Sequence, residues 1–316
     1  MDLSQDRVHQ IIEESKKDEQ EIKNMMRSSS TSTFVKGSDS PMISKLYTDK
    51  VVNIDYAIKH AQTRMWKALK VKPDFYFDIS MEETQKVLKM YAESKATFVI
   101  LYVDLVDSTR LSMELSANRL TTIIRAFTQE MSLIVTTYDG YVLKYIGDAI
   151  LAFFIVDSSD NMYNRCANAI NCACSMMKVI RQGINPILNQ YDYPELGVRI
   201  SIDVGENTVV QLGWDTHTLD GRIILKDPHL DILGYTINIT AKMTAFAKPN
   251  QIVIGQLVYQ TLDNRQKSTF RFLSINPEIW NYFSNNTGGI YQLYGSMNES
   301  DFNDSNNFIH IKPESR

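Results

Sequence analysis

The sequence predicts an α+β protein whose core is a ferredoxin-like sheet of the order β-α-β-β-α-β, with an extra hairpin arm and preceding helices. Three observations predict this core. An apolar strand at 97–104 precedes a long helical pattern, two apolar strands flank the dipeptide Gly147-Asp148, and a second helical pattern leads into another strand. This order along the chain is that of a split β-α-β motif.

The elements after residue 95 follow one another closely. We expect helices at about 108–138, 161–188 and 236–248, and strands at about 97–104, 140–146, 149–155, 196–203 and 251–254. Residues 204–213 are expected to form a second hairpin, and the polar stretch 214–229 an extended arm.

Pattern and composition divide the chain into four parts. Residues 1–42 are charged or rich in Ser and Thr and are expected to be flexible, and residues 296–316 are expected to be disordered. Residues 43–95 show two helical patterns, the second of which opens with a capping box at 80–83. These helices either pack against the following domain, 96–295, or form a dimerising or signal-receiving segment that binds a regulatory partner together with the N-terminal residues.

Composition excludes several classes of protein. The 316 residues are 44% hydrophobic and 22% charged, which is typical of a globular chain with a sizeable core. No apolar run approaches the roughly 20 residues of a membrane-spanning helix, and the N-terminus lacks a signal pattern, so we expect a cytoplasmic protein with no membrane partner. A net charge of −4 argues against nucleic acid as a partner.

Two carboxylates end apolar strands. Asp104 follows the strand at 97–104, and Asp148 lies in the turn of the hairpin. The first strand and the hairpin are neighbours in a ferredoxin-like sheet, so both acids are expected at one end of it. Such a pair can hold two Mg²⁺ or Mn²⁺ ions about 3.5–4 Å apart for phosphoryl displacement. The alternative for Gly147-Asp148 is an ordinary two-residue turn.

The residues after Asp104 are candidates for phosphate binding. A strand that turns directly into a helix at Asp107, Ser108 and Thr109 directs backbone N–H groups outward, where they can bind an anion. The glycine at position 147 lets the backbone of the other turn approach a ligand closely. The alternative is that Asp107 or Ser108 simply caps the helix.

A third motif spans residues 231–242. Asp231 ends the arm, and Asn238 and Lys242 are four residues apart on a predicted helix. An amide and an ammonium group on one helix face can bind a ribose oxygen and a phosphate oxygen. The alternative is an amphipathic surface helix with a solvated lysine.

The three motifs together resemble the catalytic domain of class III nucleotidyl cyclases over about residues 95–295. They read Asp-Leu-Val-Asp-Ser-Thr from Asp104, Lys-Tyr-Ile-Gly-Asp-Ala from Lys144, and Asp-Ile-Leu-Gly-Tyr-Thr-Ile-Asn from Asp231. The resemblance implies that Asp104, Asp148 and the carbonyl of Leu105 bind metal.

The same resemblance assigns the remaining roles. It implies that Lys144 and Asp231 recognise adenine, that Asn238 orients the ribose, and that Lys242 stabilises the transition state. The family usually has Arg at the last position, and Lys keeps the charge without the bidentate fork. A lysine that contacts the terminal phosphates has no counterpart in residues 285–291.

The function implied is that of an adenylyl cyclase, which converts ATP to cyclic AMP and pyrophosphate in a homodimer whose two sites are shared between protomers. A non-catalytic nucleotide-binding regulatory dimer is the first alternative, because the transition-state position is weakened. A guanylyl cyclase is the second.

Overall fold

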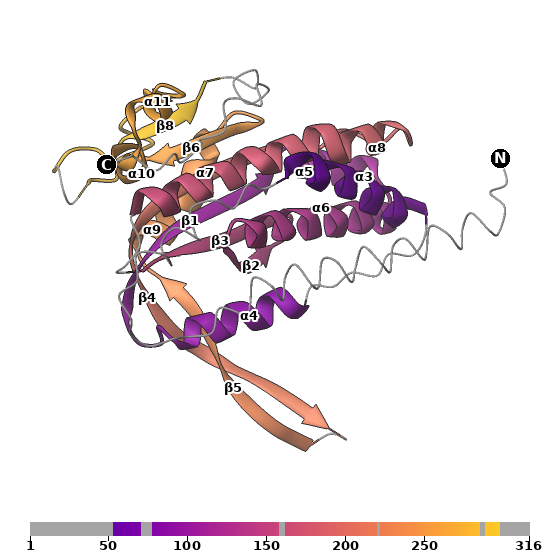
Figure 1. Ribbon diagram of the computed structural model, residues 1–316, viewed down its shortest axis with the longest axis horizontal. Helices are drawn as coiled ribbons and strands as arrows, with labels where there is room; N and C mark the ends of the chain where they lie inside the picture. Colours follow the sequence, from indigo (N-terminus) through magenta and orange to yellow (C-terminus); the bar gives the residue numbers. More distant parts are fainter. Residues whose placement is uncertain (1–52, 71–77, 158–161, 220–221, 285–287, 298–316) are drawn as a thin grey trace. The chain divides into compact units, whose positions relative to one another are not determined.

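The fold is that of a computed structural model and is described for residues 53–70, 78–157, 162–219, 222–284 and 288–297 (Figure 1). For 78–80, 215–219 and 222–227 only the backbone is described. The chain divides into the units Met1–Lys50 and Val51–Arg316, and every described residue belongs to the second. The predictions for residues 1–42, and for all but two residues of the tail at 296–316, lie outside the described part.

The described strands form one eight-stranded sheet of the order β2-β3-β1-β4-β6-β8-β7, with β5 paired to β4. Its strands are β1 (Lys95–Leu105), β2 (Tyr141–Ile146), β3 (Ala149–Val156), β4 (Val198–Leu219), β5 (Arg222–Leu233), β6 (Gln251–Gly255), β7 (Phe270–Phe272) and β8 (Leu293–Ser296). The α-helices are α3 (Ile54–Lys70), α4 (Asp78–Lys89), α5 (Ser108–Glu114), α6 (Ala117–Thr137), α7 (Met162–Val179), α8 (Asn185–Asn189), α9 (Tyr235–Met243), α10 (Gln256–Thr261) and α11 (Asn264–Lys267).

The ferredoxin-like core is confirmed. β1 pairs antiparallel with β3 on one side and with β4 on the other, and β2 pairs antiparallel with β3. The order β2-β3-β1-β4 is that of a split β-α-β motif. β6 then extends the sheet parallel to β4. Because β1 is central, four consecutive side chains, Phe98 to Leu101, are fully buried.

The two faces of the sheet have separate cores. On one face, Leu101 and Val103 of β1 join a large cluster with residues of α3, α6 and α7. On the other face, Phe98 and Ile100 join a smaller cluster with residues of α4, β5 and α9. Strand side chains alternate between faces, so Asp104 shares the second face with Ile100.

The predicted hairpin at 204–213 is wrong. β4 continues as one strand from Val198 to Leu219 and pairs with β5 in an arm that extends beyond the sheet (Figure 1). Gly205 lies within this continuous strand and does not mark a turn. Its lack of a side chain makes room for α9, because a Cβ added there would lie 2.3 Å from the hydroxyl oxygen of Thr236. A glycine within a strand often marks such a close approach. The arm predicted at 214–229 is confirmed as the outer part of this hairpin.

Two predicted helices are interrupted. The helix expected at 108–138 is two helices, α5 and α6, because Leu115 and Ser116 adopt extended backbone conformations between them. Serine is favoured at the residue before a helix, where Ser116 lies. The helix expected at 161–188 contains a π turn, Ile180–Ile184, between α7 and α8, and the one expected at 236–248 ends in the 3₁₀ turn Thr244–Phe246.

The N-terminal helices pack against the sheet unit. Ala61 and Met65 of α3 are fully buried in the larger cluster, and Arg64 donates two hydrogen bonds, of 2.5 and 2.6 Å, to the carboxylate of Glu130 on α6. This supports the packing alternative for α3, while a dimerising or receiving role stays a prediction. Among the described residues, no helix combines the length and apolar character needed to cross a bilayer.

Candidate nucleotide and metal site

Asp104 and Asp148 lie at the same end of the sheet. Val103 pairs with Ile150 and Ile146 pairs with Ala149, so the turn at positions 147 and 148 lies directly beside the end of β1. Burial raises the pKa of Asp104, and the negative charge of Asp148 raises it further. Burial also raises the pKa of the neighbouring Tyr102, and the negative charges of Asp104 and, to a smaller extent, Asp148 raise it further. The two acids are therefore close enough to repel each other.

These residues fit a divalent metal ion. Oδ2 of Asp148 is buried and has no hydrogen-bond partner among the described residues. A buried carboxylate oxygen in that state is stabilised by a cation. The described residues contain no cluster of three or more His, Cys, Asp or Glu side chains that could hold a metal. A metal here would therefore bind the two carboxylates, the backbone carbonyl of Leu105 and oxygens of a ligand.

Arg199 is a candidate site residue that the sequence patterns do not predict. It lies opposite Asp104 in the pairing of β1 with β4, and its charge lowers the pKa of that carboxyl. Its Nε is buried without a hydrogen-bond partner in the described part of the chain. A guanidinium with an unpaired Nε beside Asp104 can bind a phosphate oxygen. The signal in the sequence is a single Arg within the apolar strand at 196–203.

Asp107, Ser108 and Thr109 lie where β1 turns into α5. Asp107 has a left-handed backbone conformation, with φ of 54°, and makes no side-chain cap for the helix. The capping alternative for Asp107 is therefore wrong. Gly147 also has positive φ, 65°, and no atom lies within 4 Å of an added Cβ, so the turn backbone faces open space on that side. Both turns border the carboxylates.

The structure brings Lys144 and Asp231 together across 87 residues of sequence. The ammonium of Lys144 on β2 donates a hydrogen bond to Oδ2 of Asp231 on β5, which is 7% exposed. Oδ1 of Asp231 accepts a hydrogen bond of 2.8 Å from the backbone N–H of Ile232. A lysine donor and a carboxylate acceptor thus lie side by side.

Helix α4 fixes the two strands that carry this pair. The Thr84 hydroxyl donates to the carbonyl of Val142 on β2 at 2.9 Å. The Gln85 amide donates to the carbonyl of Leu230 at 3.0 Å and accepts from its N–H at 2.9 Å. These bonds occupy backbone groups directly beside Asp231 and near Lys144, and so limit their movement.

Asn238 and Lys242 lie on the exposed face of α9. The opposite face of the helix, which includes Ile237, Ile239 and Thr240, is buried. The Asn238 amide donates to the carbonyl of Gly234 at 3.1 Å, and the Lys242 ammonium donates to the hydroxyl of Tyr282. The helix therefore presents both side chains together, as the sequence predicts.

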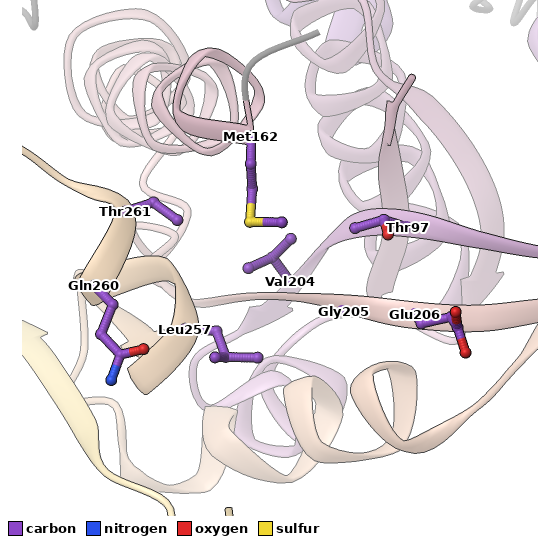
Figure 2. Close-up of a pocket in the computed structure, with 8 residues that line it drawn as sticks. All are labelled: Thr97, Met162, Val204, Gly205, Glu206, Leu257, Gln260 and Thr261. Atoms are coloured by element: carbon purple, nitrogen blue, oxygen red, sulfur yellow. The ribbon is translucent and has the colours of Figure 1, made fainter. Parts of the chain in front are cut away.

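The described part of the chain also contains a cavity of about 360 Å³ at the other end of β1 (Figure 2). Thr97 of β1, Val204 of β4, Met162 of α7 and Leu257 of α10 line it. Thr97 and Asp104 are seven residues apart, roughly 23 Å along a strand. None of the predicted site residues lines this cavity.

The chain resembles curated proteins over more than half of its length. A cytidylate cyclase of Escherichia coli is 30% identical over 174 residues, which are 54% of this chain and 37% of that relative. A cytidylate cyclase of Staphylococcus aureus is 26% identical, over 66% of this chain and 44% of the relative. The chain thus spans less than half the length of these curated relatives.

A solved structure supports the fold. The crystal structure of the adenylyl cyclase CyaB from P. aeruginosa superimposes with a TM-score of 0.50 at 20% identity, over 65% of this chain and 95% of that one. The family model of the adenylate and guanylate cyclase catalytic domain matches residues 90–277, more than half of the chain. The protein therefore belongs to the adenylate and guanylate cyclase catalytic domain family, the class III nucleotide cyclases.

Proposed function

We propose that the protein cyclises a nucleoside triphosphate whose base is adenine or cytosine, which carries on its Watson–Crick edge an exocyclic amine beside an unprotonated ring nitrogen, releasing a 3′,5′-cyclic monophosphate and pyrophosphate. The observation that carries this proposal is the ion pair of Lys144 and Asp231. The ammonium can donate to the ring nitrogen while the carboxylate accepts from the amine. ATP is the substrate that the sequence predicts, and CTP is the second candidate.

CTP is a candidate for two reasons. Cytosine presents the same acceptor and amine donor side by side as adenine does, so the Lys144–Asp231 pair matches both bases. The two curated relatives described above are named cytidylate cyclases. Guanine and uracil carry an exocyclic oxygen beside a ring N–H, which reverses the order of donor and acceptor. A site that matches the donor and acceptor of adenine or cytosine therefore leaves buried polar groups unpaired when guanine or uracil binds.

The carboxylates, Asp104 and Asp148, with the carbonyl of Leu105, would hold two Mg²⁺ or Mn²⁺ ions. Bound metal would lower the pKa of the ribose 3′-hydroxyl and neutralise charge on the departing pyrophosphate. Arg199 would bind a phosphate oxygen beside the two acids. The backbone at 107–109 and at Gly147 leaves room for the phosphates to approach.

Asn238 and Lys242 would act at the reacting centre. The amide of Asn238 would orient the ribose, and the charge of Lys242 would stabilise the negative charge that develops on the phosphoryl group. In the proposed homodimer, one protomer supplies Asp104 and Asp148, while its partner supplies Lys144, Asp231, Asn238 and Lys242. Exposed apolar side chains border these positions: Ile146, 47% exposed, precedes the turn, and Tyr235, 46% exposed, begins α9. Such side chains are common at interfaces.

The experiment is to incubate the purified protein with ATP, CTP, GTP or UTP and either metal, and to identify the products by mass spectrometry. Preferred cyclisation of ATP or CTP supports the proposal and decides between them. A preference for GTP or UTP would refute the base assignment. Nucleotide binding without any product would instead support the non-catalytic alternative, which the lysine at position 242 favours.

A reversed pair tests the base assignment directly. The double variant Lys144→Glu, Asp231→Lys keeps an ion pair but reverses donor and acceptor, so it should lose its preference for adenine or cytosine over guanine and uracil. The matched control reverses Lys95 and Glu206, an exposed pair with a separation of 3.0 Å at the start of β1. The control should keep the wild-type preference.

A further inference from the structure

Lys242 has a partner on a different part of the chain. Its ammonium donates a hydrogen bond of 2.5 Å to the hydroxyl of Tyr282 and lies 4.9 Å from the centre of the Tyr282 ring. Tyr282 therefore holds Lys242 through its hydroxyl.

Tyr282 is itself held in place. Its carbonyl accepts a hydrogen bond of 2.7 Å from the backbone N–H of Tyr291, and its ring packs edge-on against Trp280 with centroids 4.9 Å apart. Trp280 is 3% exposed, and its indole N–H donates to the carbonyl of Tyr291 at 2.7 Å. A phenol on such a support loses little freedom when it contacts a ligand.

Lys242 and Tyr282 together provide an arrangement of two donors that a lysine alone lacks. An ammonium is a point charge on a flexible stem, whereas a guanidinium presents two parallel donors to a phosphate. The Tyr282 hydroxyl accepts one hydrogen bond from Lys242 and still carries its own proton. Lys242 and Tyr282 thus offer an ammonium N–H and a phenolic O–H next to each other.

We propose that Tyr282 is a catalytic residue that donates its hydroxyl proton in a hydrogen bond to a phosphate oxygen of the substrate, beside the bond donated by Lys242. The inference rests on the proposed function and adds a residue to it. Tyr282 supplies the second donor, and Lys242 supplies the charge.

The first test measures turnover. Tyr282→Phe keeps the ring on Trp280 and removes only the hydroxyl, so kcat/KM should fall by about 10- to 100-fold, the effect of one hydrogen bond to a charged group. Adding Lys242→Arg to this variant should restore at least part of the loss, because the guanidinium brings its own second donor. Tyr294→Phe is the matched control, because its hydroxyl donates to Gln292 on the far side of β6 and should not affect turnover. A Tyr282→Phe variant with wild-type or higher kcat/KM, or one that Lys242→Arg does not improve, would overturn the inference.

The second test measures binding of 3′-deoxy-ATP and 3′-deoxy-CTP with Mn²⁺ by calorimetry, since these analogues cannot cyclise. Tyr282→Phe should weaken binding several-fold, and Tyr294→Phe should not. If the wild type binds an analogue but makes no product from any natural nucleotide, the proposed function fails. The binding measurement alone then decides whether Tyr282 contacts the nucleotide. If the wild type is active and Tyr282→Phe matches it in both arms, only the inference on Tyr282 fails. A wild type that binds neither analogue overturns both.

Discussion

Replacing Asp203 by Asn should stabilise the protein at neutral pH. Asp203 lies in β4 and is 1% exposed. Its Oδ1 accepts hydrogen bonds of 2.7 Å from the Tyr291 hydroxyl and 2.9 Å from the N–H of Val204. An asparagine offers the same acceptor oxygen and imitates the neutral carboxylic acid, so it should keep both bonds without a buried charge.

The magnitude follows from the pKa of the buried group. Burial raises the pKa of Asp203 from 3.8 to about 7, although the bonds from Tyr291 and Val204 act in the opposite direction. A shift of about 3 units corresponds to roughly 4 kcal/mol. Because the folded pKa is raised, the neutral form stabilises the protein fully below the unfolded pKa near 4. That stabilisation is lost as the pH rises to the folded pKa near 7.

The assay is urea unfolding of both proteins between pH 4 and pH 8.5. The free energy of unfolding of Asp203→Asn minus that of the wild type should grow by up to roughly 4 kcal/mol between pH 4 and pH 7 and change little above about pH 8. Asp192→Asn, which removes an exposed acid, is the matched control and should follow the wild type. Parallel curves for the wild type and Asp203→Asn would refute the reasoning.

Three further predictions concern the site and its support. Asp148→Asn should lower turnover by roughly 10³-fold without changing the melting temperature, because the charge that would hold metal is lost; near-normal turnover by mass spectrometry would contradict the metal assignment. Asp104→Ala and Asn238→Ala should each be inactive, yet mixing them with proven subunit exchange should restore part of the activity, and a mixture that stays inactive would rule out shared sites. Gly205→Ala should destabilise folding by about 1–3 kcal/mol in urea, because its Cβ would lie 2.3 Å from the Thr236 hydroxyl oxygen, and an unchanged midpoint would refute that close contact.

The sheet could be predicted because its strands carry strong local patterns. The apolar runs of β1, β2 and β3 gave strand positions within two residues at each end. A ferredoxin-like order then determines which strands are neighbours, and this is why Asp104 and Asp148 could be expected at one end. The position of these two acids at one end of the sheet therefore follows from the topology, which the order of strands and helices along the sequence predicts.

Contacts between distant segments could not be predicted in the same way. Nothing local in the sequence shows that Lys242 meets Tyr282, 40 residues later. A glycine in a strand is equally compatible with a turn and with a helix packed closely against it, so the sequence alone does not show that β4 continues through Gly205. Arg199 was missed for a related reason, since its role depends on its neighbour Asp104 across the sheet.

β4 shows how one strand connects the fold to the site. Its even positions, Ile200, Ile202 and Val204, are buried in the larger core. Its odd positions are polar or glycine, and all face the side that carries the site: Arg199, Ser201, Asp203, Gly205 and Asn207.

Three of these odd positions of β4 contact α9. Ser201 donates to the carbonyl of Thr240 on α9 at 2.7 Å, and the Asn207 side chain accepts from the N–H of Ile237 at 3.4 Å. Gly205 lets the helix approach closely. The strand thus fixes α9 at both ends of the helix, and the buried polar row of β4 positions the exposed face that presents Asn238 and Lys242. A substitution in this row should therefore impair the site even where it contacts no ligand.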